Sequence, residues 1–163
     1  MLALSMPVLA AACGGAPTLS ATGDALADMR ADITALQARA EHAAETVRVK
    51  HVLIQFKGVN RSRATRSKEE AEMLAAEIYK KATAGEDFDA LMKQSEDPGP
   101  GDYTMSTAAK PPAGAFKRSG PGGMVAAFGD VGWRLEVGQV GVAPFDAVAS
   151  PFGWHIIKRL EPK

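Results

Sequence analysis

The chain has 163 residues, of which 46% are hydrophobic and 23% charged, an ordinary composition for one globular domain with a hydrophobic core. Its 19 basic residues balance 19 acidic ones, so the net charge of zero argues against nucleic acid or another polyanion as the partner. A single cysteine can form neither an internal disulfide nor the paired-cysteine ligand set of structural zinc.

The N-terminal segment is distinct from the rest of the chain. Residues 1–12 are apolar or small and lead directly into Cys13. The run is too short to span a bilayer, which takes about 20 apolar residues, but it has the length of a signal-peptide core. It resembles the lipobox of bacterial lipoproteins, in which the cysteine becomes the lipidated N-terminus. We therefore expect a signal segment over residues 1–13, lipidation at Cys13 and tethering in the cell envelope. The alternative is an uncleaved apolar tail with an incidental cysteine.

A tether and a helix are expected next. Residues 14–25 are mostly small and polar and are typical of a flexible linker. Over residues 26–46, apolar side chains recur at steps of three and four, which predicts an amphipathic helix. This helix would dock either on the domain that follows or on a second copy of the chain, as a dimer. The repeating positions are Leu26, Met29, Ile33, Leu36, Ala40, Ala43 and Val47.

Residues 47–161 are expected to form the globular domain. An apolar, strand-like run predicts a first strand over residues 47–56. Ser67 then caps a helix, because Glu70 follows three residues later and completes a capping box. A short second helix is expected to begin near residue 87.

The second half of the domain is harder to place. Residues 97–123 are rich in glycine and proline, and only residues 114–116 suggest a short strand there. A third helix is expected over residues 124–135, and two final strands follow, the last over residues 153–160. These elements predict an α+β fold with a small four-stranded, mainly antiparallel sheet flanked by three to four helices.

Two of the three histidines lie in strand-like segments near the two ends of this domain. His51 belongs to the first strand and His155 to the last, so both imidazoles meet on one sheet if the strands are neighbours. Between them lie a Ser-Glu-Asp-Pro segment at residues 95–98, and then Met124 with Phe128. In this order, across the whole domain, these segments resemble the parvulin family of peptidyl-prolyl isomerases.

The resemblance implies isomerisation of X-Pro bonds in polypeptide partners by a non-covalent mechanism, with no metal and no cofactor. It implies that His51 and His155 form a hydrogen-bonded pair beneath the site, and that Asp97 faces the substrate carbonyl. It also implies a proline pocket formed by Met124, Phe128, Trp133 and Phe152. A third wall of this pocket is expected in the neighbourhood of either Tyr103 or Ala113.

Each of these residues also has a purely structural interpretation. The helical spacing of Met124, Phe128 and Trp133 is typical of core residues. The histidines could simply tie strands together, and Asp97 before a proline is an ordinary turn residue. Only the joint order of the segments favours catalysis. The main alternative function is a parvulin-fold binding module or chaperone that holds proline-containing or unfolded chains without turnover.

A basic loop follows the first predicted strand. It contains Arg61 and Arg63, and a phosphate-directed branch of the parvulins carries an arginine pair in this loop. Guanidinium groups bind phosphate and carboxylate through charge-assisted, often bidentate, hydrogen bonds. The favoured interpretation is a solvated charge run, and a mild preference for Asp or Glu before proline is the intermediate possibility.

Overall fold

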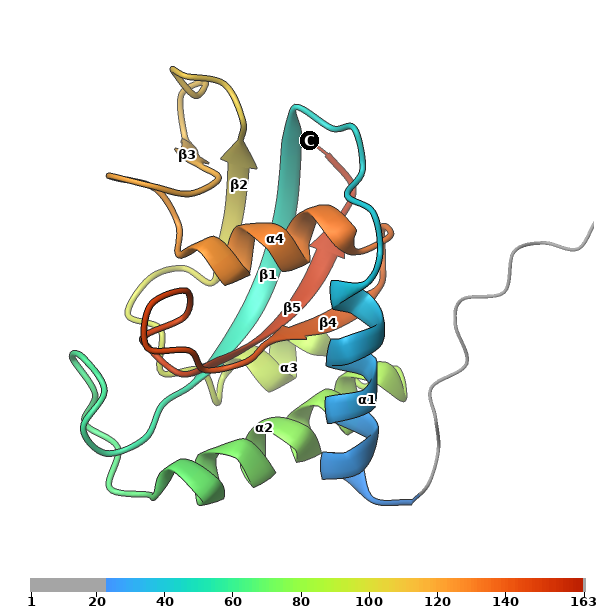
Figure 1. The fold of residues 1–163 in the computed structure, drawn as a ribbon, viewed down its shortest axis with the longest axis vertical. Helices are drawn as coiled ribbons and strands as arrows, with labels where there is room; N and C mark the ends of the chain where they lie inside the picture. The colour runs from blue at the N-terminus through green and yellow to red at the C-terminus, as the bar shows by residue number, and fades with distance from the viewer. Residues whose placement is uncertain (1–22, 163) are drawn as a thin grey trace, which may run out of the picture.

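The computed structural model describes residues 23–162, and in that part of the chain one sheet is flanked by helices on both faces (Figure 1). The α+β class is confirmed, but the prediction of four strands is wrong, because the sheet has five in the order β3-β2-β1-β5-β4. The helices are α1 Ala25–Gln37, α2 Lys68–Thr83, α3 Phe88–Met92 and α4 Ala126–Arg134. The strands are β1 Thr46–Ile54, β2 Asp102–Ser106, β3 Ala115–Lys117, β4 Val140–Ala143 and β5 Trp154–Leu160.

The additional strand comes from the turn-rich region. Both β2 and β3 lie there, and β3 matches the short strand suggested at residues 114–116. They pair with each other in parallel, whereas every other pairing in the sheet is antiparallel. β2 is short, and its alternating residues Tyr103 and Met105 pair with β1, opposite Val49 and Val47.

The two histidine-bearing strands are neighbours, as expected. β1 and β5 form the centre of the sheet, with His51 opposite Ile157 and Leu53 opposite His155. Because side chains alternate between the faces of a strand, both histidines point to the same face as Val49. That face carries α4, so the imidazoles lie between the sheet and this helix.

Glycines let α4 lie close to the sheet. A Cβ at Gly132 would stand 3.0 Å from the Met105 side chain, and one at Gly129 would stand 2.6 Å from the Arg118 carbonyl oxygen. Both glycines of α4 are therefore required by close packing, although glycine is unfavourable inside a helix. The opposite face of the sheet carries α2 and a separate apolar core, in which Met29, Ile78 and Leu91 are buried.

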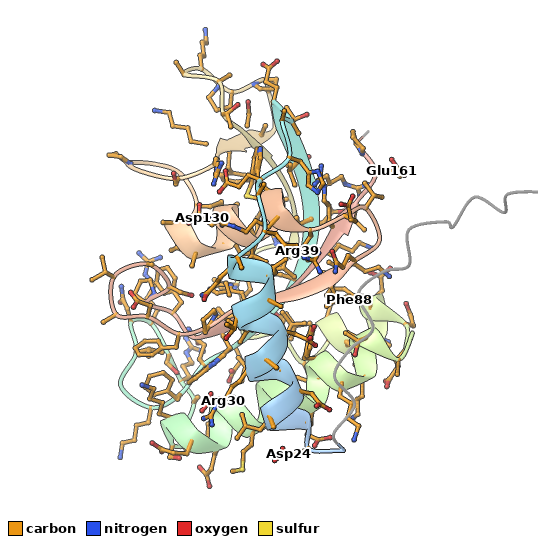
Figure 2. The ribbon with its side chains drawn as sticks, turned by 45° about the vertical axis from the view of Figure 1, so that its right-hand side comes forward. Asp24, Arg30, Arg39, Phe88, Asp130 and Glu161 are labelled. Atoms are coloured by element: carbon orange, nitrogen blue, oxygen red, sulfur yellow. The ribbon has the colours of Figure 1, made fainter. Side chains whose placement is uncertain are left out.

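The N-terminal helix is shorter than predicted. α1 starts after the N-cap Asp24 and ends at Gln37, not at residue 46 (Figure 2). The next residues run along α4 instead, because the backbone N–H of His42 donates to the Trp133 carbonyl and the Trp133 indole donates to the Ala44 carbonyl, both at 2.9 Å. These tertiary hydrogen bonds replace the bonds that a longer helix would have made.

α1 docks on its own domain. Met29 and Leu36 are buried against it, and Arg30 makes a bidentate ion pair with Glu72 of α2 at 2.7 and 2.9 Å. The apolar face of α1 is thus covered within one chain. A dimer through this helix stays a prediction, and it would have to use the exposed face. The predicted capping box of α2 is present, with Ser67 and Glu70 bonded reciprocally.

Cys13 and the predicted signal segment lie outside the described residues. Within residues 23–162, no helix combines the length and apolar character needed to cross a bilayer.

Candidate active site

The centre of the site is a pair of stacked histidines on the α4 face of the sheet. His51 Nδ1 lies 3.1 Å from His155 Nδ1, and the ring planes are 19° apart. Both side chains are buried, with 3% and 4% of their surface exposed. His51 Nε2 lies 2.9 Å from Asp97 Oδ2, so the three groups form one chain of hydrogen bonds running from loop to core.

The groups at the two ends of this hydrogen-bond network determine which atom donates and which accepts in each bond. An ionised carboxylate only accepts hydrogen bonds, so His51 carries its proton on Nε2 and donates it to Asp97. In neutral His51, Nδ1 is then an acceptor, and His155 donates to it from Nδ1–H. Burial, assisted by His51, lowers the pKa of His155 from 6.5 to about 3, which keeps this ring neutral at physiological pH. His155 Nε2 is left as a buried lone pair, with no hydrogen-bond partner among the described residues.

Asp97 is held by groups from several segments. Its Oδ2 accepts from His51 and from the Tyr103 hydroxyl at 2.7 Å, and its Oδ1 accepts from the Gly99 N–H at 3.2 Å. Burial by itself would raise the pKa of Asp97, but the hydrogen bonds from His51 and Tyr103 outweigh it and lower the pKa to about 2. The carboxylate is therefore a fixed negative charge at neutral pH.

The loop that carries Asp97 is bound to the end of β1. The Ser95 hydroxyl accepts from the Leu53 N–H at 2.9 Å and from the Asp97 N–H at 3.3 Å. The Glu96 carboxylate accepts from the Gln55 N–H and from Arg66, each at 2.7 Å. The Ser-Glu-Asp order thus has a local reason, because the first two residues anchor the loop and the third reaches His51.

An apolar wall adjoins this polar network. Phe128 of α4 is 2% exposed and points its ring edge-on to His51 and His155, with centroids 4.9 and 5.4 Å away. Tyr103 lies 6.4 Å from Phe128 and 5.5 Å from Phe116, which is 44% exposed. Met124 is partly buried against the same cluster. The structure therefore brings His51, Asp97, His155 and Phe128 together and places Tyr103 and Phe116 beside them, while their roles toward a substrate stay predictions.

Of the two candidates for the third wall, Tyr103 is the one that lies beside Phe128 and Asp97, and its part in a substrate pocket stays a prediction. The Tyr103 ring lies 6.4 Å from that of Phe128, whereas Ala113 is exposed in the loop before β3. The sequence indicated Tyr103 only through its position in the Gly101-Asp102-Tyr103 stretch. No sequence signal indicated its hydrogen bond to Asp97.

Two other predicted pocket residues make no ring contact with either histidine within residues 23–162. Trp133 is 1% exposed, and the Arg118 guanidinium stacks over its ring at 4.9 Å. Its indole N–H binds the Ala44 carbonyl in the core cluster that also contains Phe128, so a role of Trp133 in a proline pocket stays a prediction. Phe152 is partly exposed in the turn before β5, and no ring contact within residues 23–162 joins it to Phe128.

The basic loop is also separate from the polar network. Arg61 and Arg63 are exposed between β1 and α2, and no hydrogen bond or ion pair joins either of them to another described residue. Arg66 differs, because it binds Glu96 and the Gln55 carbonyl. A role for Arg61 and Arg63 toward acidic substrates stays a prediction.

A hollow of about 310 Å³ lies away from this site, between α1, the C-terminal end of α2 and β4. None of the residues in the histidine network or the apolar wall lines it. It contains the other tyrosine of the chain, Tyr79, whose hydroxyl donates to Asp32 at 3.1 Å.

Comparisons with known proteins agree with this geometry. A family model described as a PPIC-type PPIase domain matches residues 32–163. The chain is 44% identical over 93 residues to foldase protein PrsA 4 of Bacillus cereus, covering 56% of this chain and 29% of the relative. It is 42% identical over 88 residues to foldase protein PrsA of Geobacillus sp. strain WCH70, covering 53% and 27%. It is 34% identical over 117 residues to chaperone SurA of Pseudomonas fluorescens, covering 71% and 23%. The chain therefore matches less than a third of the length of each relative.

Proposed function

The chain belongs to the PPIC-type peptidyl-prolyl isomerase family, the parvulins, and on this premise we propose that it catalyses cis/trans isomerisation of X-Pro bonds in polypeptides. The observation that carries the proposal is the contact between the two halves of the site. The ring of Phe128 lies edge-on to the His51 imidazole, which is itself bonded to Asp97 and His155. A proline ring held on the apolar wall would have its amide beside the polar network.

The reaction makes modest chemical demands. The barrier to rotation of an amide is about 18–20 kcal/mol, and it arises from conjugation between nitrogen and carbonyl. No covalent bond breaks, so the catalyst only has to bind the twisted amide better than either planar form. Apolar contact with Phe128 and Met124 holds the ring and excludes water. Twisting of the amide changes the polarity of its carbonyl. The fixed charge of Asp97 and the oriented imidazoles stabilise this changed charge distribution electrostatically.

The alternative is a binding module that holds proline-containing or unfolded chains without turnover. The names of the relatives, foldase and chaperone, support this alternative. Both functions would use the same apolar surface. They differ in whether rotation is accelerated, so one assay separates them.

The test is the exchange rate between cis and trans X-Pro peptides, measured by NMR with the full chain and a panel of residues before proline. Catalysis without an added cofactor supports the isomerase. Met124→Ala should slow exchange, whereas Met73→Ala, which shortens a methionine that is 52% exposed on α2, should not. Binding of the peptides with exchange at the uncatalysed rate throughout the panel would favour the binding module.

The proposed place of action is the bacterial cell envelope, where the clients would be proline-containing envelope proteins. The support is the apolar run that ends at Cys13. A lipidated cysteine would tether the domain through residues 14–25 and leave its active face free. Stable anchoring by lipid generally takes more than one acyl chain.

A further inference from the structure

Tyr103 plays two parts in the site at once. Its ring lies between Phe116 and Phe128 and forms part of the apolar wall. Its hydroxyl reaches across to Asp97 Oδ2 at 2.7 Å, the same oxygen that accepts from His51. A leucine or phenylalanine would form the wall equally well, so the hydroxyl needs a separate explanation.

The chain makes room for that hydroxyl at Gly99. A Cβ on Gly99 would overlap the Tyr103 hydroxyl oxygen and would also lie 3.4 Å from Asp97 Oδ2. The Gly99 N–H donates to the other carboxylate oxygen, Oδ1. Glycine at this position therefore allows the backbone to pass directly over the phenol while it holds Asp97 from the opposite side.

The result is a carboxylate that cannot rotate without losing hydrogen bonds. His51 holds it from β1, Tyr103 from β2 and Gly99 from the loop. These are also the titratable and polar groups that face it, with His155 of β5 behind His51 and the uncharged Phe128 on α4. Burial, together with Asp97, raises the pKa of Tyr103, so its hydroxyl remains a donor at neutral pH.

We propose that Tyr103 is a positioning residue, whose hydroxyl fixes the Asp97 carboxylate against His51 and thereby sets the proton on His51 Nε2. The inference rests on the proposed isomerase function. Tyr103 acts through Asp97 on the whole chain of hydrogen bonds, because a proton on Nε2 leaves His51 Nδ1 free to accept from His155. Loss of the hydroxyl would loosen Asp97 and mix the tautomers of both rings.

The test is Tyr103→Phe, which keeps the ring and removes only the hydroxyl. We expect kcat for X-Pro exchange to fall by roughly tenfold or more, the usual effect of losing one hydrogen bond to a charged group. KM should change little, because the wall remains. The ¹⁵N shifts of the His51 imidazole should move away from those of a ring protonated on Nε2. Gly99→Ala, which pushes the hydroxyl off Asp97 but leaves it in the chain, should reproduce both changes.

The matched control is Tyr79→Phe, which removes the hydroxyl of the other tyrosine from Asp32 in the separate hollow. It should leave the rate and the imidazole shifts at their wild-type values. Wild-type kcat and unchanged imidazole shifts in Tyr103→Phe would overturn the proposal, as would equal losses in both tyrosine variants. If the wild-type protein does not accelerate exchange, the isomerase function fails, and the imidazole shifts alone decide whether Tyr103 positions Asp97.

Discussion

Replacing Asp97 with asparagine tests whether the charge of this carboxylate stabilises the fold. The ordinary pKa of 3.8 falls to about 2 in the folded protein, and a shift of one unit corresponds to about 1.36 kcal/mol. The ionised group therefore contributes about 2 kcal/mol to the free energy of unfolding at pH 7. The side chain is only 15% exposed, so screening by solvent reduces this value little.

The sign of the pH dependence follows from the lowered pKa. A carboxyl group that is more acidic in the folded state stabilises it fully above the unfolded value of about 3.8, and this contribution is lost as the pH falls toward 2. Asp97→Asn should therefore lower the free energy of unfolding by about 2 kcal/mol at pH 7. Roughly half of that difference should remain at pH 3.

The assay is urea unfolding of both proteins at pH 7, 5 and 3, followed by circular dichroism. Glu161→Gln, an exposed carboxyl at the C-terminal end of the described chain, is the control and should differ from wild type by less than about 0.5 kcal/mol at each pH (Figure 2). A difference for Asp97→Asn that stays constant from pH 7 to pH 3 would refute the reasoning, because the lost stability would then not come from the charge.

Three further predictions concern the wall, the buried histidine and the anchor. Phe128→Ala should lower the free energy of unfolding by about 3–5 kcal/mol, since the ring is 2% exposed, and should abolish most isomerase activity in protein that circular dichroism shows to be folded. Near-full activity of that variant, beside folded but inactive His51→Gln and His155→Gln, would contradict the role of the wall. Burial, with His51, lowers the pKa of His155 from 6.5 to about 3. Between these two pH values only the unfolded chain binds this proton, so the free energy of unfolding decreases as the pH falls through this range. His155→Gln should weaken this fall in urea titrations, and an identical pH profile would show that another group is responsible. Cys13→Ser should release the protein from the membrane fraction or block its processing in the native host, and unchanged fractionation and gel mobility would reject lipidation.

Local signals in the sequence predicted the elements whose cause is local. The capping box of Ser67 and Glu70 set the start of α2, because both partners lie within one helical turn. The family resemblance, carried by the order of the segments, implied the pairing of His51 with His155 but not the bond from His51 to Asp97. The structure explains this order, since β1 and β5 are paired and the loop of Asp97 is bonded to the end of β1.

Features that depend on distant partners could not be predicted in this way. α1 ends at Gln37 because residues far along the chain, on α4, bind the segment that follows it. β2 has only a five-residue alternating pattern, with Tyr103 and Met105 as its apolar residues, and its place in the sheet comes from pairing with β1. Trp133 and Phe128 are both apolar residues of α4, and spacing alone does not show which of them faces the histidines and which faces Ala44.

The bond from Tyr103 to Asp97 is the clearest example. The two residues lie close in sequence, but their contact requires β2 to be placed beside β1 and Gly99 to leave space for the hydroxyl. The sequence by itself determined the family and the fold class, because these depend on residue order and local pattern. Only the tertiary structure decided which neighbour each side chain binds, because a hydrogen bond depends on distance and direction between atoms that separate elements bring together.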